Sequence, residues 1–153
     1  MHTVSGGCHC GNIGVTLRLP RPPNKYQPRA CDCDFCSRYD AAYVSDAQGS
    51  LAIEIEDASA VENFTQGDQL AQFMICRKCA VLIGAHFRVA GRLYAAVNAR
   101  VADASVDFGE PLVVSPKKLS APEKQQRWQS LWFADVRITG LTAGTVPTRL
   151  ARY

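Results

Sequence analysis

Residues 73–85 read FMICRKCAVLIGA, a stretch in which two apolar runs flank the four-residue segment Cys76-Arg77-Lys78-Cys79. Each apolar run has the length and composition of a core strand. A C-x-x-C turn between two such strands can bring both sulfurs to one metal ion, and zinc is the ion that prefers tetrahedral thiolate ligands. The stretch therefore predicts a metal-binding turn inside a β structure, and it raises the question of which other residues complete the site.

Five further cysteines lie nearer the N-terminus, in the groups Cys8-His9-Cys10 and Cys31-Asp32-Cys33-Asp34-Phe35-Cys36. Seven cysteines cannot all pair as disulfides within one chain, and in a reducing compartment such clusters indicate metal or thiol chemistry. Structural zinc sites close with four ligands, whereas catalytic sites keep three protein ligands and one open position.

Two partitions of the cysteines are open. The favoured one puts two zinc ions on the chain. A closed structural site is formed by Cys8, Cys10, Cys76 and Cys79, and an open site by Cys31, Cys33 and Cys36. Glycines at positions 6, 7 and 11 permit the bend that a C-x-C pair needs. The other partition joins Cys31 and Cys33 or Cys36 to Cys76 and Cys79, and leaves Cys8 and Cys10 without a role.

The hydrophobic pattern predicts a mainly β fold of short antiparallel strands with a C-terminal helix. Strands are expected at 12–19, 41–45 and 50–55, in hairpins at 61–76 and 81–100, and at 135–141, before a loosely packed tail at 142–153. The helix at 120–132 begins with Ser120 as N-cap and Glu123 three residues later, a capping box. Trp128, Leu131 and Trp132 share one face of this helix, which favours core packing over a ligand platform.

Length and charge narrow the class of protein. With 153 residues and no linker or repeat, the chain is expected to form one domain, 1–153. The net charge of +3 is carried by scattered basic residues, which makes a nucleic-acid partner unlikely. No apolar run approaches the roughly 18 residues of a membrane span, and no secretory signal is visible, so we expect a cytoplasmic protein without a membrane partner.

Three stretches, SGGCHCGNIGVTL, CDCDFCSRYDA and FMICRKCAVLIGA, resemble in order and spacing the glutathione-dependent formaldehyde-activating enzyme family, which includes centromere protein V. The resemblance runs from Ser5 to about Arg100. It implies a β-tent fold, with structural zinc on the first and last cysteine pairs and catalytic zinc on Cys31, Cys33 and Cys36. Asp32 stands where the family usually has His, and Ala80 where it usually has Gly. We therefore expect a family-like core at 1–107 and a divergent extension at 108–153.

The expected activity is that of a zinc-dependent carbon–sulfur lyase similar to S-(hydroxymethyl)glutathione synthase, acting on adducts of a thiol and an aldehyde such as glutathione and formaldehyde. A substrate thiol would occupy the open position of a zinc ion held by Cys31, Cys33 and Cys36, which we assign as the catalytic residues. Several nearby side chains are secondary candidates for proton transfer or substrate attraction, although ordinary structural roles fit each of them better: Asp32, Asp34, Asp40, His9, His86, Arg38, Arg77, Lys78, Phe35 and Tyr39.

Two other classes of function fit the same cysteines. A zinc-stabilised binding module would keep both metal sites without catalysis, and the open triad argues against it. A thiol oxidoreductase would need a reactive cysteine outside the metal sites. The favoured partition leaves no such cysteine.

Overall fold

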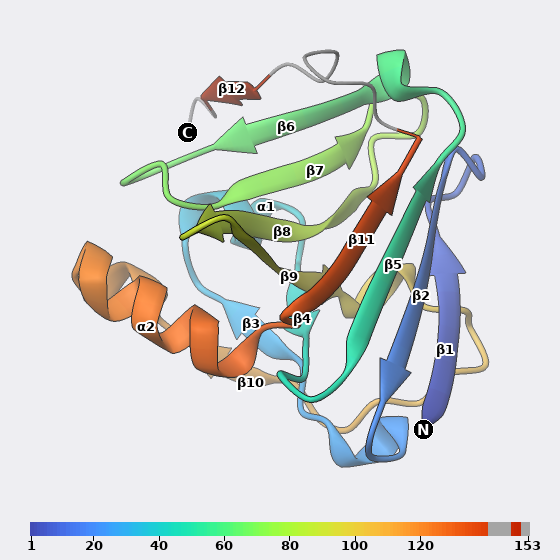
Figure 1. The fold of residues 1–153 in the computed structure, drawn as a ribbon, viewed down its shortest axis with the longest axis horizontal. Helices are drawn as coiled ribbons and strands as arrows, with labels where there is room; N and C mark the ends of the chain where they lie inside the picture. The colour runs from blue at the N-terminus through green and yellow to red at the C-terminus, as the bar shows by residue number, and fades with distance from the viewer. Residues whose placement is uncertain (141–147, 151–153) are drawn as a thin grey trace.

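The computed structural model describes residues 1–140 and 148–150, with side chains described for residues 1–140. Its strands form two sheets (Figure 1). The small sheet has the order β1-β2-β5-β11, with bounds His2–Gly7, Ile13–Leu19, Ser50–Ile55 and Asp135–Thr139. The first three strands are antiparallel, and β11 joins β5 in parallel.

The large sheet has the order β10-β3-β4-β9-β8-β7-β6-β12. Its strands, in chain order, are β3 Arg29–Cys31, β4 Ala42–Val44, β6 Val61–Thr65, β7 Gln72–Cys76, β8 Leu82–Val89, β9 Arg92–Asn98, β10 Leu112–Val114 and β12 Thr148–Leu150. The edge strand β10 pairs in parallel with β3, and the opposite edge strand β12 pairs in parallel with β6. The other pairs are antiparallel. Two α-helices, α1 (Asp34–Arg38) and α2 (Ala121–Leu131), and short 3₁₀ turns at Pro23–Lys25, Ala58–Ala60, Ala99–Val101 and Pro116–Lys118 complete the described chain.

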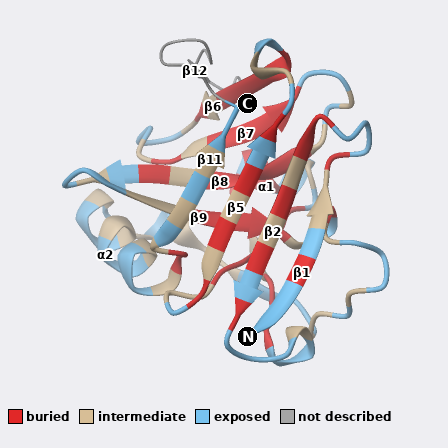
Figure 2. Cartoon of the chain, turned by 45° about the vertical axis from the view of Figure 1, so that its right-hand side comes forward, coloured by how far each residue is buried: buried red, intermediate tan, exposed pale blue. Residues whose placement is uncertain are grey.

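The central strands of the large sheet are buried on both faces. Alternate side chains of a strand point to opposite faces of the sheet, so each of these strands contributes to two cores. In β7, Met74 and Cys76 join a core shared with the small sheet, whereas Phe73 and Ile75 join a second core. Burial along β2 and β5 is visible in Figure 2. The second core contains the cysteines of α1 and Trp132, which follows α2. The large sheet therefore separates an inter-sheet core from a face covered by helices.

The expected mainly β class with a C-terminal helix is confirmed. The strands at 12–19, 41–45, 50–55 and 135–141 and both hairpins appear as β2, β4, β5, β11, β6–β7 and β8–β9. The capping box of Ser120 and Glu123 is present at the start of α2. Of the tail expected at 142–153, residues 148–150 form β12, and the rest lies outside the described residues. Within the described chain, no helix combines the length and apolarity that a membrane crossing requires.

Candidate metal centres and cavity

The first cysteine group joins the two sheets. Cys8 and Cys10 follow β1, while Cys76 ends β7 and Cys79 lies in the turn before β8. The four Sγ atoms all lie within 4.8 Å of one another, with Cys10 Sγ 3.6 Å from Cys8 Sγ and 3.5 Å from Cys76 Sγ. The chain reverses after Cys10 through Gly11, which has a φ of +83°. This is the four-cysteine group that the favoured partition predicted.

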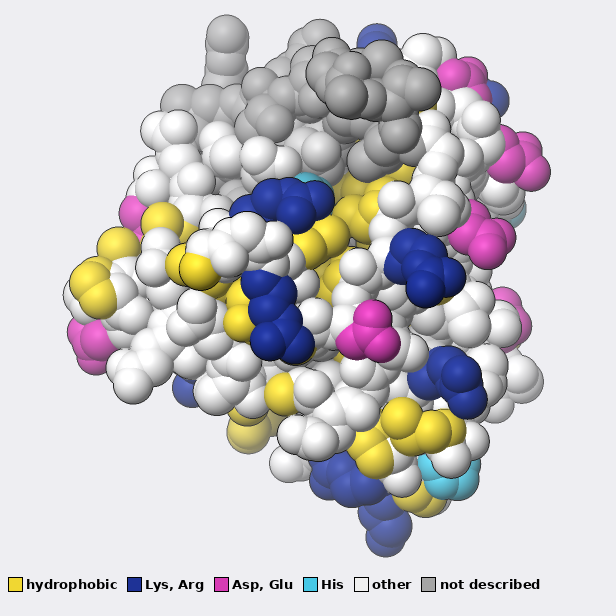
Figure 3. Space-filling view, in the orientation of Figure 1, with side chains coloured by type: hydrophobic (Ala, Val, Ile, Leu, Met, Phe, Trp, Pro, Cys, Tyr) yellow, Lys and Arg dark blue, Asp and Glu magenta, His cyan; other side chains and the backbone are white. Residues whose placement is uncertain are grey.

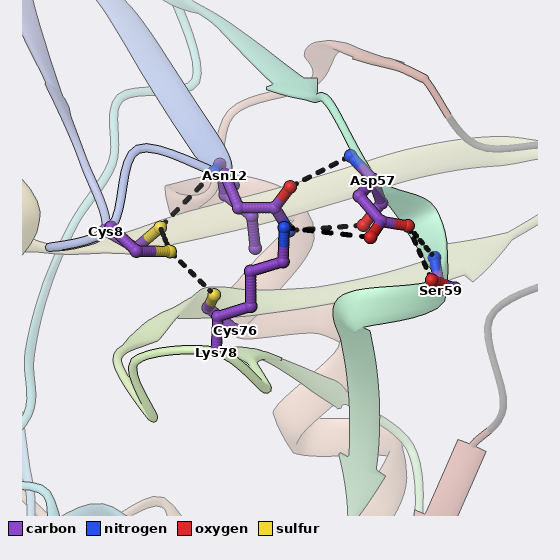
Figure 4. Close-up of polar contacts among 8 residues, drawn as sticks. Cys8, Asn12, Asp57, Ser59, Cys76 and Lys78 are labelled. Carbon is purple, nitrogen blue, oxygen red and sulfur yellow. Dashed lines mark hydrogen bonds and ion pairs between the residues drawn. The ribbon is translucent and has the colours of Figure 1, made fainter.

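Polar contacts with neighbouring residues fix the turn after β1 and the Cys76–Cys79 turn (Figure 4). The Ile13 N–H donates to Cys8 Sγ at 3.3 Å. The Asn12 side chain accepts from the Asp57 N–H at 2.9 Å and donates to the Asp57 carbonyl at 3.1 Å, and Lys78 lies 3.7 Å from the Asp57 carboxylate. The N-terminal cysteine turn and the Cys76–Cys79 turn are thus both attached to the segment after β5.

Protonation chemistry at this group favours a bound cation. Burial raises the pKa of Cys76 to about 12 and also raises the pKa of Cys8. Four sulfurs this close can all be thiolates only if a positive charge compensates them. A tetrahedral zinc ion supplies that charge and accepts four sulfur ligands, so the donor set fits a structural zinc.

The second cysteine group lies on the helix-covered face of the large sheet. Cys31 ends β3, Cys33 is the N-cap of α1, and Cys36 lies within α1. Their Sγ atoms are mutually within 4.8 Å, and the Cys36 N–H donates to Cys33 Sγ at 3.3 Å. Among the residues with described side chains, neither a fourth cysteine nor a histidine or carboxylate joins this group. The arrangement is a three-sulfur donor set, and it fits a zinc ion with one position open to other ligands.

Two neutral side chains support the triad. The hydroxyl of Tyr43 lies 3.2 Å from Cys36 Sγ, and the Gln66 amide donates to Cys33 Sγ at 3.7 Å. Burial raises the pKa of Tyr43 well above its usual value, so its hydroxyl stays protonated. Hydrogen bonds from the Cys31 and Cys36 thiols lower the pKa of Cys33 to about 3. The same interactions raise the pKa of Cys31 to about 11 and that of Cys36 well above its usual value, so without a cation the triad favours a thiolate at Cys33 alone.

A cavity of about 420 Å³ opens beside the triad, and all three of its cysteines line it. Its walls come from β3, β4, the β6–β7 turn, β7, β8, β10 and α2. The volume is within the range typical of small-molecule sites, roughly 300 to 1,000 Å³. Aromatic, basic and sulfur-bearing side chains thus meet in one small-molecule-sized cavity.

Charged side chains of the cavity are mostly basic: Arg29, Lys117, Lys124 and Arg127, with Asp68 as the acidic member among the described residues. Asp68 is paired with Lys124 at 2.7 Å. Burial, and next the charge of Arg127, lower the pKa of Arg29 to about 10, which leaves it positively charged at neutral pH.

Asp32, Asp34 and Asp40, which lie near the triad in the sequence, are not among the residues that line the cavity. Asp32 accepts a hydrogen bond from Ser115 at 2.5 Å, and its other carboxylate oxygen is buried without a partner among the described residues. Asp34 is exposed in the first turn of α1, and Asp40 forms an ion pair with Arg100. Asp34 and Asp40 thus have the turn and surface positions that the sequence favoured, whereas Asp32 is not a solvated carboxylate, because one of its oxygens is buried.

The histidines and basic residues singled out from the sequence also lie elsewhere. His86 hydrogen-bonds Asn63 at 3.2 Å, and His9 is exposed beside the first cysteine group. Arg77 and Lys78 pair with Glu62 and Asp57. Phe35 packs against Phe73 with 4.6 Å between ring centroids.

Sequence reasoning missed most of the cavity. Tyr43 and Gln66 carry no local signal, because only the pairing of β4 with β9 and the β6–β7 turn bring them to the triad. Lys117, Lys124 and Arg127 belong to the scattered basic residues that the sequence did not assign to any site, and the structure places them in the cavity lining. The helical stripe of Trp128, Leu131 and Trp132 packs into the second core as expected, but all three residues also line the cavity.

Comparison with known proteins places this geometry in a family context. The family model described as "Glutathione-dependent formaldehyde-activating enzyme" matches residues 3–116, which include all seven cysteines. The crystal structure of a Rhodobacter sphaeroides protein is similar in fold, with a TM-score of 0.55 and 24% sequence identity over 72% of this chain and 99% of that chain. A search among curated proteins found no match. Helix α2 lies beyond the matched residues.

Proposed function

The chain belongs to the glutathione-dependent formaldehyde-activating enzyme family, and from that premise we propose that it is a zinc-dependent carbon–sulfur lyase that forms and cleaves adducts of a thiol and an aldehyde. The observation that carries this proposal is the triad Cys31, Cys33 and Cys36: three sulfurs line a cavity without a fourth protein ligand among the described side chains. An ion held there would have a position left for a substrate, which a closed structural site lacks.

The residues of the triad would hold the zinc ion, which would supply a fourth coordination position and stabilise a substrate thiolate there. With the ion bound, Cys36 would be a thiolate and would accept a hydrogen bond from the Tyr43 hydroxyl 3.2 Å away, and Gln66 donates an amide proton toward Cys33. Both donors reduce the charge density on the ligand sulfurs. Phe73 and Trp132, both largely buried, exclude water from one side of the cavity, which strengthens these interactions.

The first cysteine group has a structural role in this proposal. Its ligands come from both sheets, and its sulfurs already number four, so it offers no open position. The activity needs reduced thiols, and for that reason we place the protein in the cytoplasm.

The alternative of a binding module for nucleic acid has less support. On the face seen in Figure 3, Lys and Arg side chains form separate spots among neutral and acidic ones. Nucleic-acid binding surfaces usually gather basic residues into a patch or stripe. The cavity of about 420 Å³ at the triad instead suits a small molecule.

The proposed activity is tested by NMR exchange spectroscopy on zinc-loaded protein with glutathione and formaldehyde, repeated with a panel of small thiols. We expect faster exchange between free aldehyde and adduct with wild-type protein. Cys33→Ser should abolish the acceleration, whereas Arg18→Gln, a change at an exposed residue of β2 outside the cavity and both cysteine groups, should leave it intact. If no thiol–aldehyde pair exchanges faster than in buffer, the protein is not a lyase of this kind.

A further inference from the structure

The C-terminal helix forms a wall of the cavity that the family match does not cover. The match ends at residue 116, while Lys124, Arg127, Trp128 and Leu131 lie on α2 and Trp132 follows it. The end of α2 is anchored from the family-like part of the chain, because Ser45 donates a hydrogen bond to the Leu131 carbonyl at 2.8 Å. The same Ser45 hydroxyl accepts a hydrogen bond from Arg29. The added helix is thereby tied to the strand that carries Cys31.

This wall is flat and aromatic. The rings of Trp128 and Trp132 are stacked with 4.8 Å between centroids and 18° between planes, and Phe87 packs edge-on against both. Phe73 and Leu131 also line the cavity. The two indoles make this wall aromatic, and an aromatic ring of a ligand would pair favourably with them.

The cavity also carries positive charges that its own carboxylate does not neutralise. Asp68 is already paired with Lys124 at 2.7 Å. Within the described part of the chain, no carboxylate lies at ion-pair distance from Arg29, Lys117 or Arg127. A zinc ion with three thiolates would carry a net charge of −1, which offsets one of these cations and leaves the others for a ligand.

These two properties suit glutathione only in part. Its two carboxylates could pair with the cations of the cavity, but its ammonium group would find the carboxylate of Asp68 already engaged by Lys124, and glutathione has no aromatic group to place against the indoles. Its two amides would find few neutral hydrogen-bonding side chains, since Tyr43 and Gln66 are those that line the cavity. Buried amides without partners cost about 1 to 3 kcal/mol each.

We propose that α2 is a specificity element and that the cavity selects, in preference to glutathione, an anionic thiol with a flat apolar body. The inference rests on the proposed function for the role of the triad. The thiol group would lie at Cys31, Cys33 and Cys36, the flat body against Trp128 and Trp132, and the anionic group near Arg29 and Arg127.

The test compares four thiols by calorimetric titration of zinc-loaded wild-type protein: para-mercaptomethylbenzoate, phenylmethanethiol, an aliphatic mercaptohexanoate and glutathione. The thiol group is common to all, so its contribution cancels to first approximation. We expect the benzoate to bind about tenfold tighter than phenylmethanethiol, because a charge-assisted hydrogen bond is lost without the carboxylate. It should bind about threefold tighter than mercaptohexanoate, because aromatic stacking is lost. It should also bind tighter than glutathione.

Two variants assign the preferences to α2. Arg127→Gln should reduce the preference for the carboxylate, while Arg137→Gln, the same change on an exposed arginine of β11 outside the cavity, should leave it unchanged. Trp128→Leu should reduce the preference for the aromatic body. Circular dichroism verifies that each variant is folded, and the wild-type ranking stands without them.

Glutathione binding as tightly as the benzoate, or absence of either preference in the wild type, would overturn the inference. So would an Arg127→Gln protein that keeps the full carboxylate preference. Failure of the proposed function has a different signature: no thiol would support accelerated aldehyde exchange, whatever the order of binding affinities.

Discussion

Replacing one cysteine by serine should unfold the protein in one cysteine group and should only remove a zinc ion in the other. The sulfurs of Cys8, Cys10, Cys76 and Cys79 lie within 4.8 Å of one another and come from two different sheets. An ion held by them would therefore link distant parts of the chain. Structural zinc binding contributes about 10 kcal/mol or more in small zinc domains, and a whole domain is stable by about 5 to 15 kcal/mol. Cys79→Ser should consequently leave the protein largely unfolded at 25 °C.

Cys33→Ser should be mild by comparison. Cys33 is the N-cap of α1, and its sulfur accepts the Cys36 N–H at 3.3 Å. Serine is among the best N-cap residues, so its hydroxyl can accept the same hydrogen bond. The three ligands of this group lie within the segment 31–36, and losing their ion disconnects no distant elements. We expect a loss of about 1 kcal/mol, which lowers Tm by about 3 °C in a domain of this size.

The assay is zinc content by mass spectrometry together with thermal unfolding by circular dichroism on the two variants and the wild type. Wild type should contain two zinc ions per chain, and Cys33→Ser should stay folded with one. Since both variants carry the same chemical change, only the position differs. Equal unfolding of both variants, or a folded Cys79→Ser protein with two zinc ions, would refute the division into a closed and an open site.

Three further predictions follow from individual contacts. Tyr43→Phe removes the hydroxyl 3.2 Å from Cys36 Sγ; the loss of a hydrogen bond to a charged sulfur should reduce turnover about tenfold with little change in Tm, and unchanged turnover would show that the hydroxyl has no role. Burial lowers the pKa of His86 to about 4, so the unfolded chain binds the extra proton first as pH falls. The free energy of unfolding should therefore decrease by up to about 3 kcal/mol between pH 6.5 and pH 4. In denaturant titrations, His86→Gln should lack this pH-dependent decrease. Ala80 has a φ of +63°, a conformation that costs alanine about 1 kcal/mol more than glycine; Ala80→Gly should raise Tm by a few degrees, and a lower Tm would contradict this account of the turn.

Local patterns were sufficient for much of the fold. The alternation in residues 13–19 and the two hairpins around Gly67 and Gly91 identified their strands, and Ser120 with Glu123 located the start of α2. The spacing of the seven cysteines favoured one of two partitions, and the structure brings together the two groups of that partition. Strand β1 was not predicted, because HTVSGG lacks a clear apolar alternation. The three-residue strands β3, β10 and β12 also escaped, since each is held mainly by its neighbours.

The cavity could not be predicted in the same way because it is a product of long-range pairing. Arg29 and Cys31 share one face of β3, but their meeting with Trp128 and Arg127 depends on where α2 packs. The sequence described Trp128 and Trp132 correctly as core residues. The sequence could not indicate that these core residues also line a cavity, because core packing and cavity lining both place apolar residues on one helix face.

The most direct test of the open triad is a crystal structure of the zinc-loaded protein, measured at the zinc absorption edge with a bound thiol. We expect two anomalous peaks per chain. The ion at Cys31, Cys33 and Cys36 should take its fourth ligand from the sulfur of the added thiol, while the ion at the other four cysteines should be unchanged. A protein side chain in that fourth position, or a disulfide in place of the triad's ion, would contradict the account.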